Sequence, residues 1–183
     1  MGTIKNFKYK LIKNFISEEE RNILKGYCEL KHRNNFNSFD DLQSDNRDTM
    51  YYGDPITDTL MLNKKIIVEK ETGLNLLPTY SFWRCYSKFA NLEKHVDRPS
   101  CEVSVTANIG SDGTGWPLYV NGEKFDCEVG DGVIYLGCDY EHWREEFSGD
   151  YCIQTFLHYV NKDGPNKEWH KDKRKLFGQN KER

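Results

Sequence analysis

The sequence lacks any long apolar run. No stretch of its 183 residues is long and apolar enough to span a membrane, and residues 1–10 contain lysines but no apolar core of the kind found in signal peptides. These two absences argue against a membrane span and a signal peptide. A basic block is also missing and the formal net charge is −3, so the charge pattern does not indicate nucleic acid as an obligatory partner.

Paired cysteine motifs are missing as well. The six cysteines are scattered without a C-x-x-C pair, and most of them lie inside strand-like apolar runs. Their even number fits disulfides, but their placement favours free, mostly buried thiols in a reducing compartment. There is no internal repeat and no domain boundary, and this length suits one domain with a single core.

Two helices are predicted in the first part of the chain. Ser17 and Glu20 form a capping box before apolar residues at helical spacing, which predicts a helix over 18–31. A second helix is predicted over 57–72, with Gly73 as its stop. The dipeptide before it, Asp-Pro at 54–55, predicts a turn.

Strand-like runs dominate after Pro78. They are rich in aromatic and β-branched residues and are bounded by Gly, Asp or Asn, and a further strand is expected over 9–15. Asn121-Gly122 predicts a hairpin, because both residues tolerate positive φ. The other expected strands are 79–86, 101–109, 116–120, 132–136 and 152–160.

Short strands joined by turns after two helices predict a mainly β fold, a sheet-on-sheet roll with helices packed outside. We expect one domain over 1–183, with a helical part at about 1–77, a core at about 78–160 and a polar tail at 161–183. The Asn-, Ser- and Asp-rich segment 32–48 is expected to form a loop. Over 32–52 this polar stretch is also the place where a substrate lid would lie.

The segment around His95 carries the chemistry. His95 and Asp97 are separated by one residue, so on an extended segment their side chains point to the same face. His142 would complete a set of two histidines and one carboxylate, which holds Fe(II) on one face and leaves positions open for substrate and oxygen. The motif is short, and a histidine near a strand end also fits a partly exposed polar residue.

The ordered set of motifs resembles the 2-oxoglutarate and Fe(II)-dependent oxygenases, and within them the prolyl-4-hydroxylase-like branch with its small bacterial and phage members. The likeness covers about 77–169. It rests on Tyr86, Leu92, His95-Val96-Asp97 with the following 98–102, Trp116-Pro117-Leu118, Gly130-Asp131-Gly132, His142-Trp143-Arg144-Glu145, Gly149, the run 154–160, Gly164-Pro165 and Trp169.

This resemblance implies a double-stranded β-helix, or jelly roll, with N-terminal α-helices packed on one sheet. It also implies Fe(II) held by His95, Asp97 and His142, with 2-oxoglutarate as co-substrate, O2 as oxidant and ascorbate as an optional reductant. The implied reaction is hydroxylation with release of succinate and CO2. The implied location is the cytoplasm of a bacterium or of a phage-infected host.

One departure concerns the co-substrate. The family places an Arg or Lys about ten residues after the distal histidine, to hold the outer carboxylate of 2-oxoglutarate, but residues 149–154 contain no basic side chain. A buried carboxylate without a cation is costly. Arg144 is the first candidate for the missing charge, followed by Arg84 on the same strand as Tyr86, and then by Arg98.

The roles of these residues have alternatives. Tyr86 matches a pocket-lining tyrosine of the family, and Arg98 and Trp143 are candidates for contact with substrate or support of the metal site. Arg144 also fits a solvated surface charge, and Trp143 also fits simple packing. His158 is expected to be a satisfied core or sheet-face histidine.

The function predicted is an Fe(II)- and 2-oxoglutarate-dependent dioxygenase acting on a peptidyl prolyl residue or a small molecule. The main alternative is a non-catalytic jelly-roll module that binds metal or serves a structural role, and a zinc hydrolase with the same ligands is a third. A nucleobase demethylase fits less well, because the arginines expected after the distal histidine are missing. The oligomeric state is left open.

Overall fold

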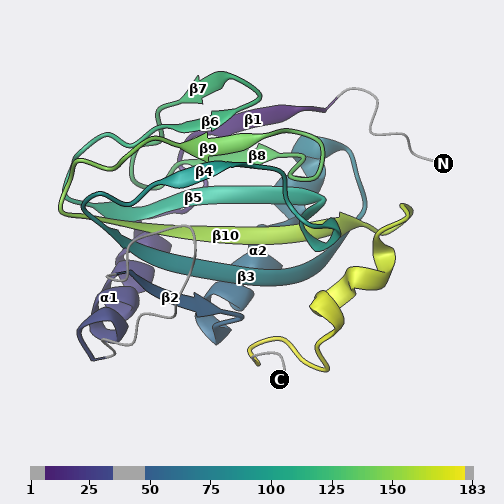
Figure 1. The fold of residues 1–183 in the computed structure, drawn as a ribbon. Helices are drawn as coiled ribbons and strands as arrows, with labels where there is room; N and C mark the ends of the chain where they lie inside the picture. Colours follow the sequence, from purple (N-terminus) through teal and green to yellow (C-terminus); the bar gives the residue numbers. More distant parts are fainter. Residues whose placement is uncertain (1–6, 35–47, 180–183) are drawn as a thin grey trace.

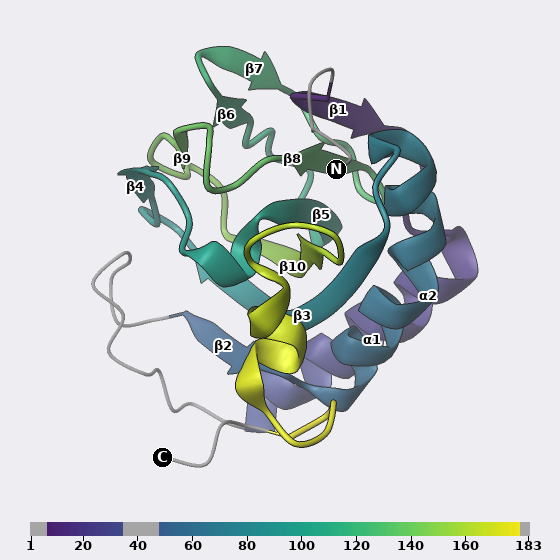
Figure 2. The ribbon, with the colours of Figure 1, turned by 90° about the vertical axis from the view of Figure 1, so that its right-hand side faces the viewer.

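The computed structural model describes residues 7–34 and 48–179. Within them, two antiparallel sheets face each other, and two long helices lie against the outer face of the larger sheet (Figures 1 and 2). This arrangement confirms the expected jelly roll with N-terminal helices on one sheet. In the described part of the chain, no helix is both long enough and apolar enough to cross a membrane.

The larger sheet has six strands and the smaller has four. In spatial order, the larger sheet contains β1 (Tyr9–Ile12), β8 (Gly132–Tyr135), β5 (Val103–Ser111), β10 (Tyr151–Asn161), β3 (Leu76–Ser87) and β2 (Thr49–Tyr52). The smaller contains β4 (Leu92–His95), β9 (His142–Arg144), β6 (Leu118–Val120) and β7 (Glu123–Phe125). Two short 3-10 helices, η1 (Pro99–Cys101) and η2 (Lys167–Lys173), complete the described elements.

Both helices begin at polar caps. In α1 (Glu18–Asn34) the backbone N–H of Ser17 donates to Glu20 at 2.8 Å and the N–H of Glu20 donates to Ser17 at 3.3 Å, which confirms the capping box. The turn expected at 54–55 is instead the start of α2 (Pro55–Thr72), because Asp54 caps the helix and Pro is favoured at the first helical position. Gly73 ends α2 with φ 71°, as expected.

The main core lies between the helices and the larger sheet. Alternate residues of β3 divide its two faces: Trp83 and Cys85 pack in the core with Met61 of α2, whereas Arg84 and Tyr86 face the space between the sheets. The alternation that buries the core therefore also aims polar side chains at the interior of the roll.

The six strands expected from the sequence correspond to β1, β3, β5, β6, β8 and β10. β2, β4 and β9 were not expected, because their three or four residues show no clear period. The hairpin at Asn121-Gly122 is confirmed, with φ values of 52° and 85° between β6 and β7. Most of the expected loop and lid, residues 35–47, lies outside the described residues.

Candidate metal centre

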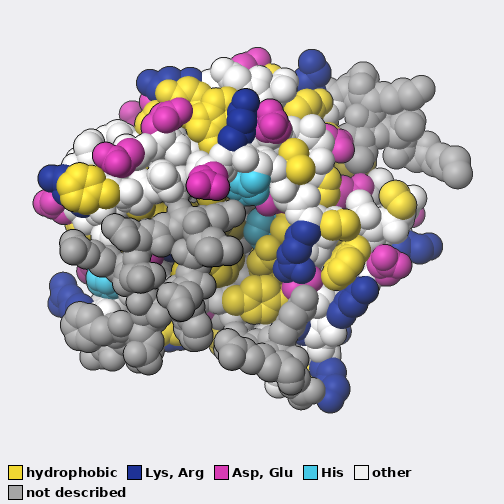
Figure 3. Space-filling model, in the orientation of Figure 1, with side chains coloured by type: hydrophobic (Ala, Val, Ile, Leu, Met, Phe, Trp, Pro, Cys, Tyr) yellow, Lys and Arg dark blue, Asp and Glu magenta, His cyan; other side chains and the backbone are white. Residues whose placement is uncertain are grey.

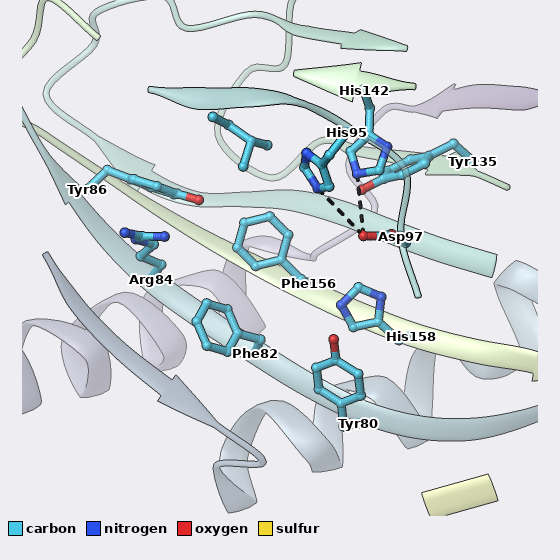
Figure 4. Close-up of a pocket in the computed structure, with 11 residues that line it drawn as sticks. Tyr80, Phe82, Arg84, Tyr86, His95, Asp97, Tyr135, His142, Phe156 and His158 are labelled. Carbon is cyan, nitrogen blue, oxygen red and sulfur yellow. Dashed lines mark ion pairs between the residues drawn. The ribbon is translucent and has the colours of Figure 1, made fainter. Parts of the chain in front are cut away.

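Two short strands bring the candidate ligands together. His95 ends β4 and His142 begins β9, and the two residues are direct partners in this antiparallel pair. Asp97 follows two residues after His95, and its backbone N–H donates to the carbonyl of Gly137 at 2.8 Å. Figure 4 shows all three side chains converging at one side of a cavity.

Hydrogen bonds fix the orientation of both imidazoles. Nδ1 of His95 lies 2.7 Å from the carbonyl of Glu93, and Nδ1 of His142 lies 3.0 Å from the carbonyl of Tyr140. A carbonyl oxygen only accepts, so each Nδ1 carries the hydrogen and each Nε2 presents a lone pair. These Nε2 atoms lie 3.7 and 3.6 Å from Oδ1 of Asp97. The three ligand atoms lie within 4.8 Å of one another, as a shared metal ion requires.

Asp97 is oriented by its surroundings. Oδ2 accepts from the Ser104 hydroxyl at 2.9 Å, which leaves Oδ1 for the two histidines. A Cβ on Gly137 would lie 2.3 Å from Oδ2, so the glycine is needed for the carboxylate to fit. Burial raises the pKa of Asp97, but the imidazoles of His142 and His158 beside it and the hydrogen bond from Ser104 outweigh burial and lower the pKa below its usual value. The carboxyl is therefore ionised and able to bind a cation.

A second group, Asp97 with Cys101 and His158, also lies within 4.8 Å. Here the Ser104 hydroxyl lies between two of the members, 2.9 Å from both Oδ2 of Asp97 and Nδ1 of His158. Burial raises the pKa of the Cys101 thiol to about 12, so it stays protonated and binds metal poorly. We interpret this group as a hydrogen-bond network that supports Asp97.

A cavity of about 180 Å³ opens beside the three ligands. In the space-filling view, histidine side chains are visible on this face next to hydrophobic ones (Figure 3). The residues that line the cavity come mainly from the inner faces of β3 and β10, and most of them are aromatic. The residues are Tyr80, Phe82, Arg84, Tyr86, Leu92, His95, Asp97, Tyr135, His142, Phe156 and His158.

Arg84 and Tyr86 line the same end of the cavity (Figure 4). The guanidinium of Arg84 lies 4.7 Å from the ring of Tyr86, and its Nε donates to Asp48 at 3.0 Å. Both partners of this ion pair are buried. Arg84 therefore reaches the cavity already neutralised by a carboxylate.

Arg144 is buried but does not line the cavity. Its Nη1 donates to the backbone carbonyl of Trp116, and its Nη2 donates to Oε1 of Gln154 at 3.3 Å. Its Nε has no hydrogen-bond partner. Within the described ranges, no carboxylate lies within ion-pair distance of this guanidinium.

The other two candidates lie outside the cavity. Arg98 is at the rim, where Nη1 and Nη2 donate to Asp172 of η2 at 3.0 and 2.9 Å. Trp143 points to the opposite face of β9 from His142 and stacks on Tyr119, with ring centroids 5.1 Å apart.

The contacts that join Arg98, Asp172 and the rings of Tyr52 and Tyr80 were not predicted from the sequence. Asp172 is fully buried and also accepts from the Tyr52 hydroxyl at 2.5 Å. Tyr52 stacks on the cavity-lining Tyr80 at 4.8 Å, and the guanidinium of Arg98 lies 4.7 Å from the ring of Tyr80. The polar composition of residues 161–183 did not predict the contact between Asp172 and Arg98. The roles of Ser104 and Gly137 in orienting Asp97 were not marked by any sequence motif either.

No protein-family model matches the chain, and no curated protein matches it. Solved structures do match. A prolyl-4-hydroxylase from Pseudomonas putida has a TM-score of 0.68 at 15% identity, over 86% of this chain and 95% of that one. The α-ketoglutarate-dependent carbocyclase SnoK from nogalamycin biosynthesis has a TM-score of 0.68 at 14% identity, over 88% and 87%. A Trichoplax adhaerens prolyl hydroxylase in complex with a hypoxia inducible factor peptide has a TM-score of 0.64 at 13% identity, over 87% and 86%. At these identities the likeness establishes the fold.

Proposed function

We propose that the protein is an Fe(II)- and 2-oxoglutarate-dependent dioxygenase that hydroxylates its substrate and releases succinate and CO2. The observation that carries the proposal is the convergence of two anchored imidazoles and one ionised carboxylate at the wall of a cavity. This ligand set suits Fe(II) and leaves coordination positions open. By their names, two of the structural neighbours described above are prolyl hydroxylases and the third is a non-heme α-ketoglutarate-dependent enzyme, which supports the assignment.

The residues present fit an iron ion. His95, Asp97 and His142 would hold it, and its binding would supply redox chemistry with O2. The chain itself orients the ligands through Ser104 and Gly137, as described above. The aromatic side chains that line the cavity would orient the group to be oxidised.

The co-substrate would lie in the same cavity. Arg144, Arg84 and Tyr86 are the residues proposed to hold it: Arg84 and Tyr86 line the cavity, and Arg144 is a buried cation outside its lining. Burial raises the pKa of Tyr86 to about 12, so its hydroxyl stays protonated and can donate. Figure 4 shows this hydroxyl directed into the cavity.

The substrate is a peptidyl prolyl residue or a small molecule. One of the neighbours is a prolyl hydroxylase in complex with a peptide, and another is a carbocyclase, so the fold is compatible with either class of substrate.

We place the enzyme in the cytoplasm, because all six cysteines are free. The chain acts as one domain, with its site between the two sheets.

The test is an anaerobic absorbance titration of the Fe(II)-loaded protein with 2-oxoglutarate. Chelation of iron by the 2-oxo acid gives a weak visible band, which we expect to saturate in the wild type and to be missing in His142→Ala. Stoichiometric iron binding without a band would instead favour the non-catalytic module.

A further inference from the structure

Five residues of α1 form a line along its outer side. They follow one another at intervals of four, three, four and three residues, which keeps them on one side of a helix. Leu24 and Cys28, which pack in the core, lie on the opposite side. The line, which we call the outer stripe, consists of Glu19, Ile23, Gly26, Leu30 and Arg33.

The two aliphatic side chains of the outer stripe are exposed. Ile23 is 66% exposed and Leu30 is 62% exposed, and their spacing of seven residues makes both project from the same side of α1. An apolar groove of about 140 Å³ between α1 and α2 adjoins Ile23, and its lining includes Ile56 and Leu60 of α2. The stripe and the groove together form an apolar surface that fits a second helix.

Gly26 lies in the middle of the outer stripe. Glycine inside a helix is destabilising relative to alanine, because it loses more backbone freedom on folding. An added Cβ at this position would meet no atom within 4 Å, and the φ of Gly26 is not positive, so packing within the described residues does not require a glycine here. A missing side chain lets another backbone approach closely. The glycine therefore indicates a contact between α1 and another molecule.

The two ends of the outer stripe carry opposite charges. The carboxylate of Glu19 accepts from the hydroxyl of Ser17 at 3.0 Å, and Arg33 is exposed at the other end of the helix. Neither Glu19 nor Arg33 has an ion-pair partner in the parts of the chain that the structure describes, whereas the neighbouring Glu20 is paired with Lys64 at 2.6 Å. A copy of the stripe that runs in the opposite direction would therefore bring each charge to its opposite.

We propose that this surface binds a second copy of the same chain, with the two α1 helices antiparallel about a two-fold axis at Gly26. Glu19 then lies against the partner's Arg33, and Ile23 lies against the partner's Leu30 beside the groove. At the axis the two glycines meet. A parallel arrangement would instead place like charges together at both ends. A contact of this two-fold kind closes on itself and yields a dimer.

The dimer leaves the metal centre accessible. α1 lies against the outer face of the larger sheet (Figures 1 and 2), and among the described residues none of α1 lines the cavity. The inference therefore does not rest on the proposed function, and the two stand or fall separately. An interface of one helix from each subunit is small, so we expect a dissociation constant in the micromolar range.

The test is sedimentation equilibrium of the full-length protein, from low to high micromolar concentration. We expect the wild type to change from monomer to dimer over this range. Leu30→Gln should weaken the dimer on the order of 100-fold, because each dimer buries this side chain twice. Ile66→Gln on α2 is the matched control, since Ile66 is 72% exposed but lies outside the outer stripe, and it should leave the dissociation constant unchanged.

Exchange of the charges tests the antiparallel direction. Glu19→Arg and Arg33→Glu should each weaken the dimer about 10-fold, because each variant places like charges in both end layers. A mixture of the two variants has opposite charges in both layers, and we expect it to associate like the wild type. All these side chains are exposed, so the melting temperature of the dilute monomer should be the same in every variant.

Four results would overturn the inference. A wild type that stays monomeric at every concentration would exclude the dimer. A dimer that Leu30→Gln leaves intact, or that Ile66→Gln weakens as strongly, would place the interface elsewhere. Single charge variants that associate like the wild type would contradict the antiparallel pairing, and a mixture that stays as weak as its components would do the same.

Discussion

His95 and His142 face each other across the β4–β9 pair with ring centroids 4.3 Å apart. Each ring is fixed by the same local bond, from its Nδ1 to the backbone carbonyl two residues earlier. The backbone of two short strands therefore sets the direction of both Nε2 atoms before any metal binds. A site prepared in this way loses little side-chain entropy when it binds an ion.

His142→Ala is expected to weaken Mn(II) binding by more than about 100-fold, because it removes a ligand rather than a supporting group. The affinity is measured by calorimetry, together with the melting temperature of the metal-free protein. His170→Ala is the matched control, since His170 lies in η2 and belongs neither to the cavity lining nor to the group of candidate ligands. Equal affinities in the two variants would contradict the assignment of the ligands.

Gly137→Ala is expected to weaken metal binding, because the new Cβ would lie 2.3 Å from Oδ2 of Asp97 and 2.6 Å from the carbonyl of Cys101. Relief of this clash has to move the carboxylate away from the histidines. Gly115→Ala is the control, because a Cβ there meets no atom within 4 Å. The idea fails if both alanine variants bind Mn(II) like the wild type.

Ser104→Ala should reduce metal affinity by about 10- to 100-fold, since it removes the hydroxyl that orients Asp97. The measurement is a Mn(II) titration beside Ser111→Ala at the end of β5, where the serine hydroxyl only accepts an exposed hydrogen bond from the N–H of Gly113. A drop in melting temperature with normal metal affinity would show that Ser104 serves only the network with His158.

Asp172→Asn should lower the free energy of unfolding by about 1–3 kcal/mol, because Asp172 is buried and accepts charge-assisted bonds from Arg98. The backbone here is strained: Lys171, Asp172 and Lys173 have φ values of 57°, 52° and 62°. Lys171→Gly should act in the opposite direction, since glycine tolerates this conformation. Chemical denaturation measures both, and a gain in stability from Asp172→Asn would contradict the assigned role of this contact.

Asp54→Asn tests a pH dependence. Burial raises the pKa of Asp54, but hydrogen bonds from Lys31 and Tyr27 outweigh it and hold the pKa below its usual value. The folded pKa is thus below the unfolded one, so this carboxylate stabilises the protein above about pH 3.9 and loses that contribution as the pH falls through the folded pKa. The stability difference between wild type and variant should be large at pH 7 and shrink below about pH 4. Denaturant titrations at both pH values check this, and a constant difference would count against it.

The sequence contains enough information for the long elements and for the pairing of the candidate ligands His95 and Asp97, because both depend on short-range patterns. The capping box at Ser17 and the spacing of His95 and Asp97 are local, and both were predicted. Gly137 and Asp172 act through contacts with residues far away in the chain, so no local pattern marks them. The burial of Arg144 and its unpaired Nε could not be predicted either, since they depend on contacts of β9 with Trp116 and with Gln154 of β10.

The position of β10 in the larger sheet bears on how a cell makes this protein. β10 follows all the other described strands in the sequence, yet it lies between β5 and β3 near the middle of the sheet. A nascent chain without it exposes two unpaired strand edges, which are templates for aggregation. Translation that stops before residue 151 would therefore yield chains that need chaperones, whereas completed chains close both edges in one step.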